Sequence, residues 1–166
     1  MVIEKRTYPR ISRVFLNSVL GPSIGVALGI GVLTFLSQIS GASYIIPSYG
    51  ASCLIAFLTP KSGFAQPKNI IGGHFLSTVV GMLCFEGLPV NWWSFAIASG
   101  ISVLLMQLSK TMHPPAAADP IMLIMQGGAA WQFWLSPVLA GSILLVFLAI
   151  IINNIIGQPY PRNWLG

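Results

Sequence analysis

The fold is decided by a proline-broken stretch between two long apolar segments, Met112-His113-Pro114-Pro115-Ala116-Ala117-Ala118-Asp119-Pro120. Proline cannot donate a backbone hydrogen bond and breaks a helix interior, so the stretch predicts irregular backbone. Inside a bilayer, each unpaired backbone N–H or C=O costs several kcal/mol, so such backbone persists only where protein buries it or a cavity holds water. The stretch is therefore a candidate transport site.

Composition places the chain in a membrane. Of its 166 residues, 55% are hydrophobic and only 7% are charged, whereas about 25% are charged in an average soluble domain. The net charge of +5 comes from sparse basic residues that flank apolar spans, so it indicates membrane topology rather than nucleic-acid binding. We expect one transmembrane domain over residues 1–166, with an all-α fold and the lipid bilayer as its surroundings.

Both ends of the chain are basic and are expected to be cytoplasmic. Residues 1–13 contain four basic side chains and lead into an apolar stretch of 24 residues, which is too long for the core of a signal peptide. The tail, residues 157–166, carries Arg162. Because residues 1–13 lack the Ser-rich character of a plastid transit peptide, we expect a bacterial plasma membrane, the inner membrane.

Hydropathy and proline positions divide the chain into six membrane segments. At about 20 residues per crossing, four are long enough to span as full transmembrane helices: residues 14–37, 69–85, 92–109 and 131–153. Two more, residues 43–60 and 111–126, are apolar but broken by proline. Each predicts a non-helical lead-in followed by a half-helix, over residues 49–58 in the first and 120–126 in the second.

The charges decide whether the broken segments cross or re-enter. If they re-enter, Lys61, Lys68 and Lys110 fall outside, against the positive-inside rule. If they cross, all eight Lys and Arg residues lie on one face and Glu86 lies on the other. Six segments are therefore favoured, and three crossings in each half make the second half an inverted repeat of the first, a 3+3 arrangement.

Glycines in the first long segment predict a close helix contact. Gly21, Gly25 and Gly29 are four residues apart and so lie on one face of a helix. Small residues at this spacing let a neighbouring helix approach closely.

In the six-segment arrangement, the two half-helices begin near the middle of the membrane and point toward each other. A helix N-terminus presents free N–H groups and the positive end of a dipole of about half an elementary charge, so two such ends predict an anion site. Gly50 leaves room for a ligand, and the small alanines leave room for an ion. The predicted substrate-binding residues are Ser48, Tyr49, Gly50, Ala51, Ser52, His113, Ala116, Ala117 and Ala118.

Ionisable and thiol side chains leave alternatives open. Asp119 is either the N-cap of the second half-helix or a proton-binding group whose protonation relieves repulsion of an anion. His113 and His74 are either buried hydrogen-bonding groups or proton and gating groups, because an imidazole changes charge near neutral pH. Cys53 and Cys84 are expected to be packing residues, and the separation of the histidines in sequence predicts no metal or cofactor.

The same residues resemble the HPP family of membrane proteins. The first block of similarity is His113-Pro114-Pro115 with small residues and Asp119 after it and residues 106–111 before it. The second consists of Pro47-Ser48-Tyr49-Gly50-Ala51-Ser52, Pro60-Lys61-Ser62, Ala65-Gln66-Pro67-Lys68-Asn69 and Gly72-Gly73-His74. The resemblance, which covers residues 44–126, implies a small polytopic protein, usually described with four spans. It also implies nitrite as a substrate, because some cyanobacterial and plastid members are implicated in nitrite transport.

These observations favour a transporter or channel for a small inorganic anion, with nitrite as the best named substrate. A pore for a small neutral solute is the alternative transport function, and an intramembrane structural or assembly protein is a different class. An enzyme is not expected, because the sequence shows no nucleophile motif with a nearby base, no metal-ligand cluster and no nucleotide-binding glycine motif. We expect a homo-oligomer of undetermined size and no nucleic-acid partner.

Overall fold

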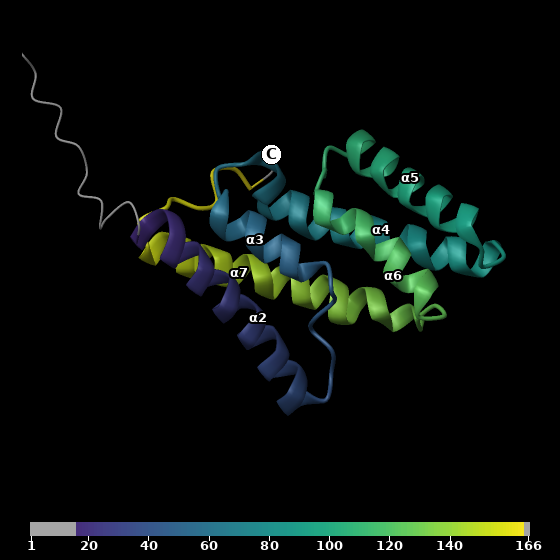
Figure 1. The fold of residues 1–166 in the computed structure, drawn as a ribbon, viewed down its shortest axis with the longest axis horizontal. Helices are drawn as coiled ribbons and strands as arrows, with labels where there is room; N and C mark the ends of the chain where they lie inside the picture. Colours follow the sequence, from purple (N-terminus) through teal and green to yellow (C-terminus); the bar gives the residue numbers. More distant parts are fainter. Residues whose placement is uncertain (1–15, 165–166) are drawn as a thin grey trace, which may run out of the picture.

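The computed structural model describes residues 16–164, and this part of the chain is all-helical (Figure 1). Its six α-helices are α2 (Gly21–Ser40), α3 (Tyr49–Leu58), α4 (Pro67–Gly87), α5 (Trp92–Leu108), α6 (Asp119–Met125) and α7 (Ala140–Ile155). Short 3-10 or π segments join them: η1 (Leu16–Leu20), η2 (Gly63–Ala65), η3 (Pro114–Ala118), η4 (Trp131–Trp134) and η5 (Leu135–Leu139). The predicted cytoplasmic segment 1–13 and the last two residues of the tail lie outside the described residues.

Within residues 16–164, three helices are long and apolar enough to cross a membrane. They cover Ser18–Ser40, Pro67–Gly87 and Trp131–Ile155, with 23, 21 and 25 residues. Three of the four predicted full spans are thus confirmed in length and composition. The fourth, α5, is apolar but has 17 residues. At 1.5 Å per residue it is about 25 Å long, somewhat less than a hydrocarbon core of about 30 Å.

Both broken segments have the predicted form of a lead-in followed by a short helix. Gly41, with φ of 72°, ends α2 in the left-handed conformation that glycine adopts without strain, and the chain then runs without helix to α3. The second lead-in is partly helical, because Pro114–Ala118 form the 3-10 turn η3. Of the two roles left open for Asp119, that of N-cap of the second half-helix is wrong. Asp119 is the first residue of α6, and its carboxylate bonds other elements instead.

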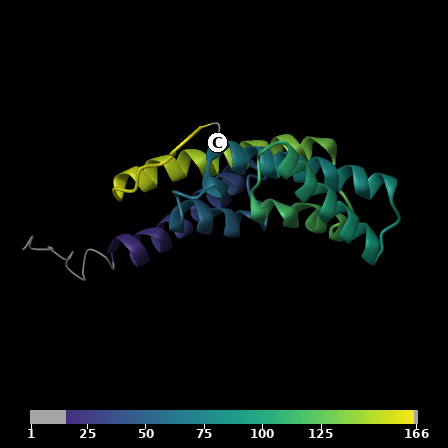
Figure 2. The same ribbon diagram turned by 90° about the horizontal axis from the view of Figure 1, so that it is seen from above.

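The helices pack in two groups of three. Figures 1 and 2 show α2, α3 and α7 together toward one end of the molecule and α4, α5 and α6 toward the other, and the same groups are in contact. The third helix of each predicted repeat therefore packs with the first two helices of the other half. Contacts between α4 and α7 and between α3 and η3 join the groups. This exchange brings α3, α4 and the start of α6 into one place.

Basic and acidic side chains lie at opposite ends of α4. Lys68 is in its first turn, directly after the loop that carries Lys61, and Glu86 is beside its last residue. The Asn69 amide, in the first turn of α4, donates a 2.9 Å hydrogen bond to the Met112 carbonyl, which holds the segment after Lys110 and α5 at this end. The backbone N–H of Arg162 donates a 2.9 Å hydrogen bond to the side-chain oxygen of Gln66, directly before α4, and so holds the tail at the same end.

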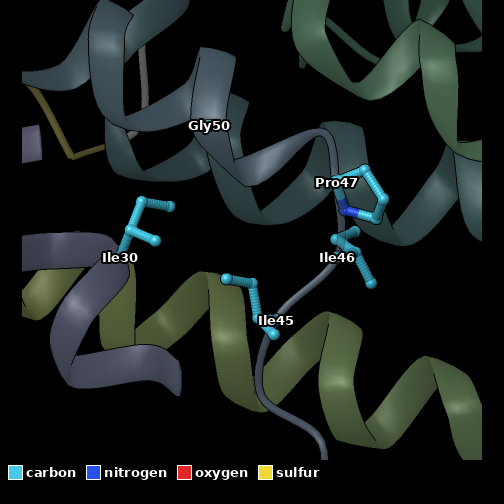
Figure 3. A pocket seen from close by; sticks show the side chains of 5 residues that line it. All are labelled: Ile30, Ile45, Ile46, Pro47 and Gly50. Carbon is cyan, nitrogen blue, oxygen red and sulfur yellow. The ribbon is translucent and has the colours of Figure 1, made fainter. Parts of the chain in front are cut away.

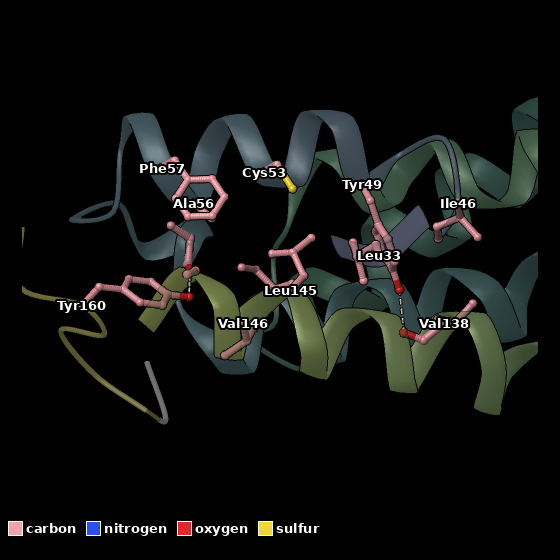
Figure 4. Packing of buried hydrophobic residues seen from close by; sticks show 13 residues of the cluster. Leu33, Ile46, Tyr49, Cys53, Ala56, Phe57, Val138, Leu145, Val146 and Tyr160 are labelled. Carbon is pink, nitrogen blue, oxygen red and sulfur yellow. Dashed lines mark hydrogen bonds between the residues drawn. The ribbon is translucent and has the colours of Figure 1, made fainter. Parts of the chain in front are cut away.

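The larger apolar core lies among α2, α3 and α7, where Leu33, Phe57 and Leu145 are fully buried (Figure 4). The predicted glycine face of α2 is confirmed as a close contact. A Cβ added at Gly25 would lie 2.8 Å from the Phe57 ring, and one at Gly29 would lie 3.1 Å from the Cys53 sulfur. Cys53 and Cys84 are buried free thiols among apolar side chains, as predicted.

Candidate functional site

Five polar side chains form a buried hydrogen-bonded chain where α3, α4 and the start of α6 meet. We call it the polar relay, and its members are Ser48, Ser52, His74, His113 and Asp119. Ser48 is 8% exposed, and the other four are fully buried. The sequence predicted all five as site residues, but as parts of separate elements. Their direct connection comes from the tertiary packing.

Short hydrogen bonds connect the members of the relay in order. The Ser48 hydroxyl donates to Oδ1 of Asp119 at 2.5 Å, and Oδ2 of Asp119 lies 2.7 Å from Nδ1 of His74. Oγ of Ser52 lies 2.8 Å from Nε2 of His74 and 2.8 Å from Nε2 of His113. The relay thus runs from one half-helix to the other through α4.

Local sequence explains why these side chains meet. Ser48 and Ser52 are four residues apart and so lie on one face at the start of α3. Gly73 of α4 lets the second lead-in approach, since a Cβ there would lie 2.7 Å from Cβ of His113 and 3.1 Å from the Thr111 carbonyl. The Asn69 side chain of α4 also holds this lead-in by the 2.9 Å bond to its backbone.

Tyr49 supports the relay from the α7 side. Its ring meets the ring of His74 edge-on, with 4.8 Å between centroids. Its hydroxyl donates to the Val138 carbonyl at 2.6 Å, a bond drawn in Figure 4. The side chain of Tyr49 therefore orients the His74 ring and fastens α3 to η5, the segment before α7. It does not lie in an open binding space.

The hydrogen bonds of the relay determine its minimum proton content. The Phe64 carbonyl only accepts, so Nδ1 of His113, 2.7 Å away, carries a proton, and Nε2 of a neutral His113 must accept the Ser52 hydroxyl proton. An ionised Asp119 also only accepts, so Nδ1 of His74 carries a proton, and Nε2 of a neutral His74 needs the same Ser52 proton. The Ser52 hydroxyl, which also lies within donating distance of the Ser48 carbonyl at 3.2 Å, has one proton and cannot serve two imidazoles. The relay therefore holds at least one further proton.

This further proton makes the relay electrically neutral. It lies either on Asp119, as a carboxylic acid, or on an imidazole, which then pairs with the carboxylate; the His74–Asp119 contact of 2.7 Å suits both. A net charge at a fully buried position would cost several kcal/mol, so burial favours the neutral relay. The arrangement can shift a proton between a carboxylate and an imidazole without moving any helix.

Three of the backbone donors that the sequence predicted for an anion are engaged in turns. The N–H of Gly50 donates to the Pro47 carbonyl at 3.2 Å, that of Ser52 to the Ser48 carbonyl at 3.1 Å, and that of Ala116 to the His113 carbonyl at 3.0 Å. These turns use the groups that a ligand would need. The expectation of free N–H groups at these three positions is wrong, and the donors aimed at the junction are side chains.

Several predicted binding residues lie away from the relay. Gly50, Ala51 and Ala118 face outward and Ala117 is half-buried, whereas Ala116 is fully buried. Half-helices this short expose the side of each turn that faces away from the bundle. These residues are therefore not brought together with His113 in one cavity.

An apolar hollow reaches the first lead-in beside the relay. Its volume is about 390 Å³. Figure 3 shows the residues that line it, between α2 and the start of α3: Ile30, Ile45, Ile46, Pro47 and Gly50. Pro47 directly precedes Ser48, so the hollow ends one residue from the relay. Its lining is apolar and offers an ion no charged partner, and none of the five relay residues lines it.

Sequence reasoning missed the carbonyl that fixes His113 and the sharing of Ser52 by two imidazoles. Phe64 lies in the loop between α3 and α4, and only the fold brings its carbonyl to His113. His74 and His113 are 39 residues apart, yet their ring centroids are 5.0 Å apart. No spacing rule in the sequence signals this pair. Within residues 16–164, no cluster of three or more His, Cys, Asp or Glu side chains is arranged to hold a metal ion.

Comparisons with known proteins agree with the family resemblance. The chain matches the family described as "HPP, transmembrane region" over residues 12–161. Two proteins of Dictyostelium discoideum, each named only as a transmembrane protein, are similar to it: one is 36% identical over 128 residues and the other 30% identical over 129. These alignments cover 72% and 73% of this chain but 45% and 42% of the relatives, so the chain spans less than half of their length. No solved structure matches the chain.

Proposed function

Because the chain belongs to the HPP family of transmembrane proteins, we propose that it is a proton-coupled transporter of a small monovalent anion, with nitrite as the best named substrate. The bilayer is implied by its apolar spans. The choice among transport functions rests on the polar relay, and specifically on how it holds Asp119.

One observation supports the proposal: the relay holds both oxygens of the Asp119 carboxyl group. The Ser48 hydroxyl donates to one oxygen of Asp119, and the His74 imidazole contacts the other. Nitrite, like a carboxylate, is bent, has two terminal oxygens and carries one negative charge. Donors placed for the two carboxylate oxygens therefore suit nitrite once Asp119 is protonated and turns away. Formate has the same features and is the natural competitor.

Charge balance then predicts the coupling. The closed relay is neutral, and a buried site that gained an anion alone would carry a net charge that the membrane interior disfavours. Entry of one anion with one proton keeps the site neutral, with the proton on the Asp119–His74 pair. We therefore propose electroneutral symport, driven by a pH gradient and insensitive to membrane potential.

This proposal revises where the anion binds. The ends of α3 and α6 do meet at the Ser48–Asp119 hydrogen bond, which supports converging half-helices. The anion is proposed to use side-chain donors of the relay, because the N–H groups of Gly50, Ser52 and Ala116 are engaged in turns. The helix dipoles then add favourable potential, chiefly that of α3, and are not the binding groups themselves.

We further propose the six-crossing, inverted-repeat topology with both termini cytoplasmic in a bacterial plasma membrane. It is supported by Lys61, Lys68, Lys110 and Arg162 sharing one end of α4, opposite Glu86. A topology in which the broken segments re-enter would separate Arg162 from Lys61 across the bilayer. The repeat is also supported by the exchange of α4 and α7 between the two helix groups.

Nitrite uptake into proteoliposomes tests the transport proposal. With the outside acidified, wild-type protein is expected to accumulate nitrite above its external concentration, whether or not the membrane potential is clamped to zero. Asp119→Asn and His113→Ala should lose this accumulation, while Glu86→Gln, which changes an exposed carboxylate away from the relay, should keep it. Flux equal to that of empty liposomes in the wild type would reject the proposal, and uptake of neutral solutes alone would favour the neutral pore.

A specific geometry favours one second candidate, a serine hydrolase. Ser52, His74 and Asp119 are connected as nucleophile, base and orienting carboxylate, with 2.8 Å and 2.7 Å between the bonding atoms. We rank it second because Ser52 is fully buried and its oxygen is already in contact with a second imidazole, that of His113, at 2.8 Å. Labelling of the wild type, but not of Ser52→Ala, by a fluorophosphonate probe would reverse this ranking.

A further inference from the structure

A basic hollow lies between the α3–α4 loop and the C-terminal tail, away from the polar relay. Its volume is about 590 Å³, and it is lined by Lys61, Gly63, Gln66, Pro159, Pro161, Arg162 and Asn163. Lys61 and Arg162 are its two formal charges. Between residues 16 and 164 the chain has two carboxylates, Glu86 beyond the far end of α4 and the buried Asp119, so neither neutralises this hollow.

Buried side chains fix the walls of the hollow. Gln66 is 3% exposed; its amide nitrogen donates to the Ser62 carbonyl at 2.8 Å, and its oxygen accepts the N–H of Arg162 at 2.9 Å. Tyr160, also 3% exposed, donates its hydroxyl to the Ala65 carbonyl at 2.7 Å. The tail is therefore held against the loop before any ligand binds, and the two cations are presented by a built surface.

The basic hollow continues into an apolar groove between α2 and α3. Lys61 also lines a second hollow of about 530 Å³, which extends along Ser18, Pro22 and Leu58. The same three residues line a third, smaller hollow of about 220 Å³, whose other walls are Val19, Ser23, Val26 and Leu54. The three hollows thus form a series: the first is basic, the second has a mixed polar and apolar lining, and the third is mainly apolar.

We propose that these three hollows are the binding site of an anionic phospholipid. Its phosphate lies between Lys61 and Arg162, and one acyl chain runs along the α2–α3 groove past Leu58. A guanidinium and an ammonium are the side chains that pair with phosphate oxygens, and an apolar groove suits an acyl chain and no soluble phosphate compound. The lipid would contact the α3–α4 loop, whose Phe64 carbonyl bonds Nδ1 of His113. The bound lipid would therefore stabilise the loop that holds His113 of the relay.

The test compares lipids retained by the purified chain in nanodiscs. Native mass spectrometry of protein from phosphatidylcholine discs containing a minority of phosphatidylglycerol should show phosphatidylglycerol enriched over its share of the disc. At about fivefold per cation, Lys61→Gln combined with Arg162→Gln should lower this enrichment about 25-fold. Lys110→Gln, a cation at the same end of the molecule but outside the hollow, should leave it unchanged.

Two further measurements make the outcome decisive without relying on transport. Leu58→Trp fills the groove, leaves the charges intact and should also reduce the enrichment, while Arg162→Lys should give an intermediate value because it keeps the charge. Enrichment unchanged in the double variant, or unchanged in Leu58→Trp, would overturn the lipid site. A third outcome would also overturn the lipid site. If inorganic phosphate bound to Lys61 and Arg162 in phosphatidylcholine-only discs as tightly as phosphatidylglycerol binds in the mixed discs, the ligand would be a soluble phosphate compound.

Discussion

Replacing Asp119 by asparagine tests the proton count of the relay more sharply than any deletion does. The amide oxygen can accept the Ser48 hydroxyl as the carboxylate does, and the amide N–H can donate to Nδ1 of His74. His74 then carries its proton on Nε2 and donates to Ser52, whose hydroxyl can donate to His113 at 2.8 Å in preference to the Ser48 carbonyl at 3.2 Å. Every hydrogen bond of the relay is thereby satisfied by neutral groups.

The expected stability follows from the same bonds. Asp119→Asn keeps them all, so the free energy of unfolding should change by no more than about 1 kcal/mol. Asp119→Ala removes the partner of both Ser48 and His74, and each buried group left unsatisfied costs about 1–3 kcal/mol, or about 2–6 kcal/mol together. For a chain of this size that corresponds to a fall in Tm of roughly 10 °C.

Thermal unfolding of the two variants in the same detergent measures this difference, and nitrite uptake measures its functional side. Asp119→Asn should be folded and nearly as stable as the wild type, yet unable to accumulate nitrite in a pH gradient, because the amide does not exchange a proton. Equal destabilisation by asparagine and alanine would show that the relay needs a charged carboxylate, and the neutral-relay reasoning would be refuted.

Three further predictions address packing, pH and topology. Gly73→Ala should lower the free energy of unfolding by about 1–3 kcal/mol, because the added methyl group pushes against the second lead-in. Gly31→Ala, whose methyl group would meet nothing within 4 Å, should leave the stability unchanged or raise it slightly. Chemical denaturation of the two variants measures the difference. Burial raises the pKa of the Tyr160 hydroxyl above its ordinary value of 10. The hydroxyl therefore contributes fully to the free energy of unfolding below pH 10, and this contribution is lost as the pH rises further. Tyr160→Phe should lack this alkaline loss of stability in melting curves recorded over a pH series. Single cysteines at Lys61 and Glu86 should react with an impermeant thiol reagent from opposite sides of the membrane, and reaction from the same side would contradict the six-crossing topology.

The parts of the fold that the sequence predicted depend on local properties of the chain. Proline positions and hydropathy marked both broken segments, because a missing N–H and an apolar side chain act wherever they occur. The face formed by Gly25 and Gly29 followed from helical periodicity alone, and it does meet Phe57 and Cys53. The length of α5 was overestimated by one residue, since its last turn ends at Leu108.

The candidate site was predicted in its members and not in its connections. Ser48, Ser52, His74, His113 and Asp119 were all expected to be site residues, but for Asp119 a helix cap stayed open beside proton binding, because an aspartate before a proline is a common cap. The carboxylate has better partners in Ser48 and His74, which come from other elements. Backbone donors were overvalued for a related reason, since the turns that begin each half-helix use those N–H groups themselves.

The sequence by itself determined the membrane class, the two broken segments, the uneven charge along the chain and the residue types available for a site. Each of these is a property of one segment and needs no knowledge of its neighbours. Only the tertiary structure decided that α4 and α7 exchange between helix groups and that Ser52 stands between two imidazoles. The role proposed for the stretch around His113-Pro114-Pro115 depends on these tertiary contacts. The proton content of a hydrogen-bonded chain is set by which atoms face each other, and those atoms come from segments far apart in sequence.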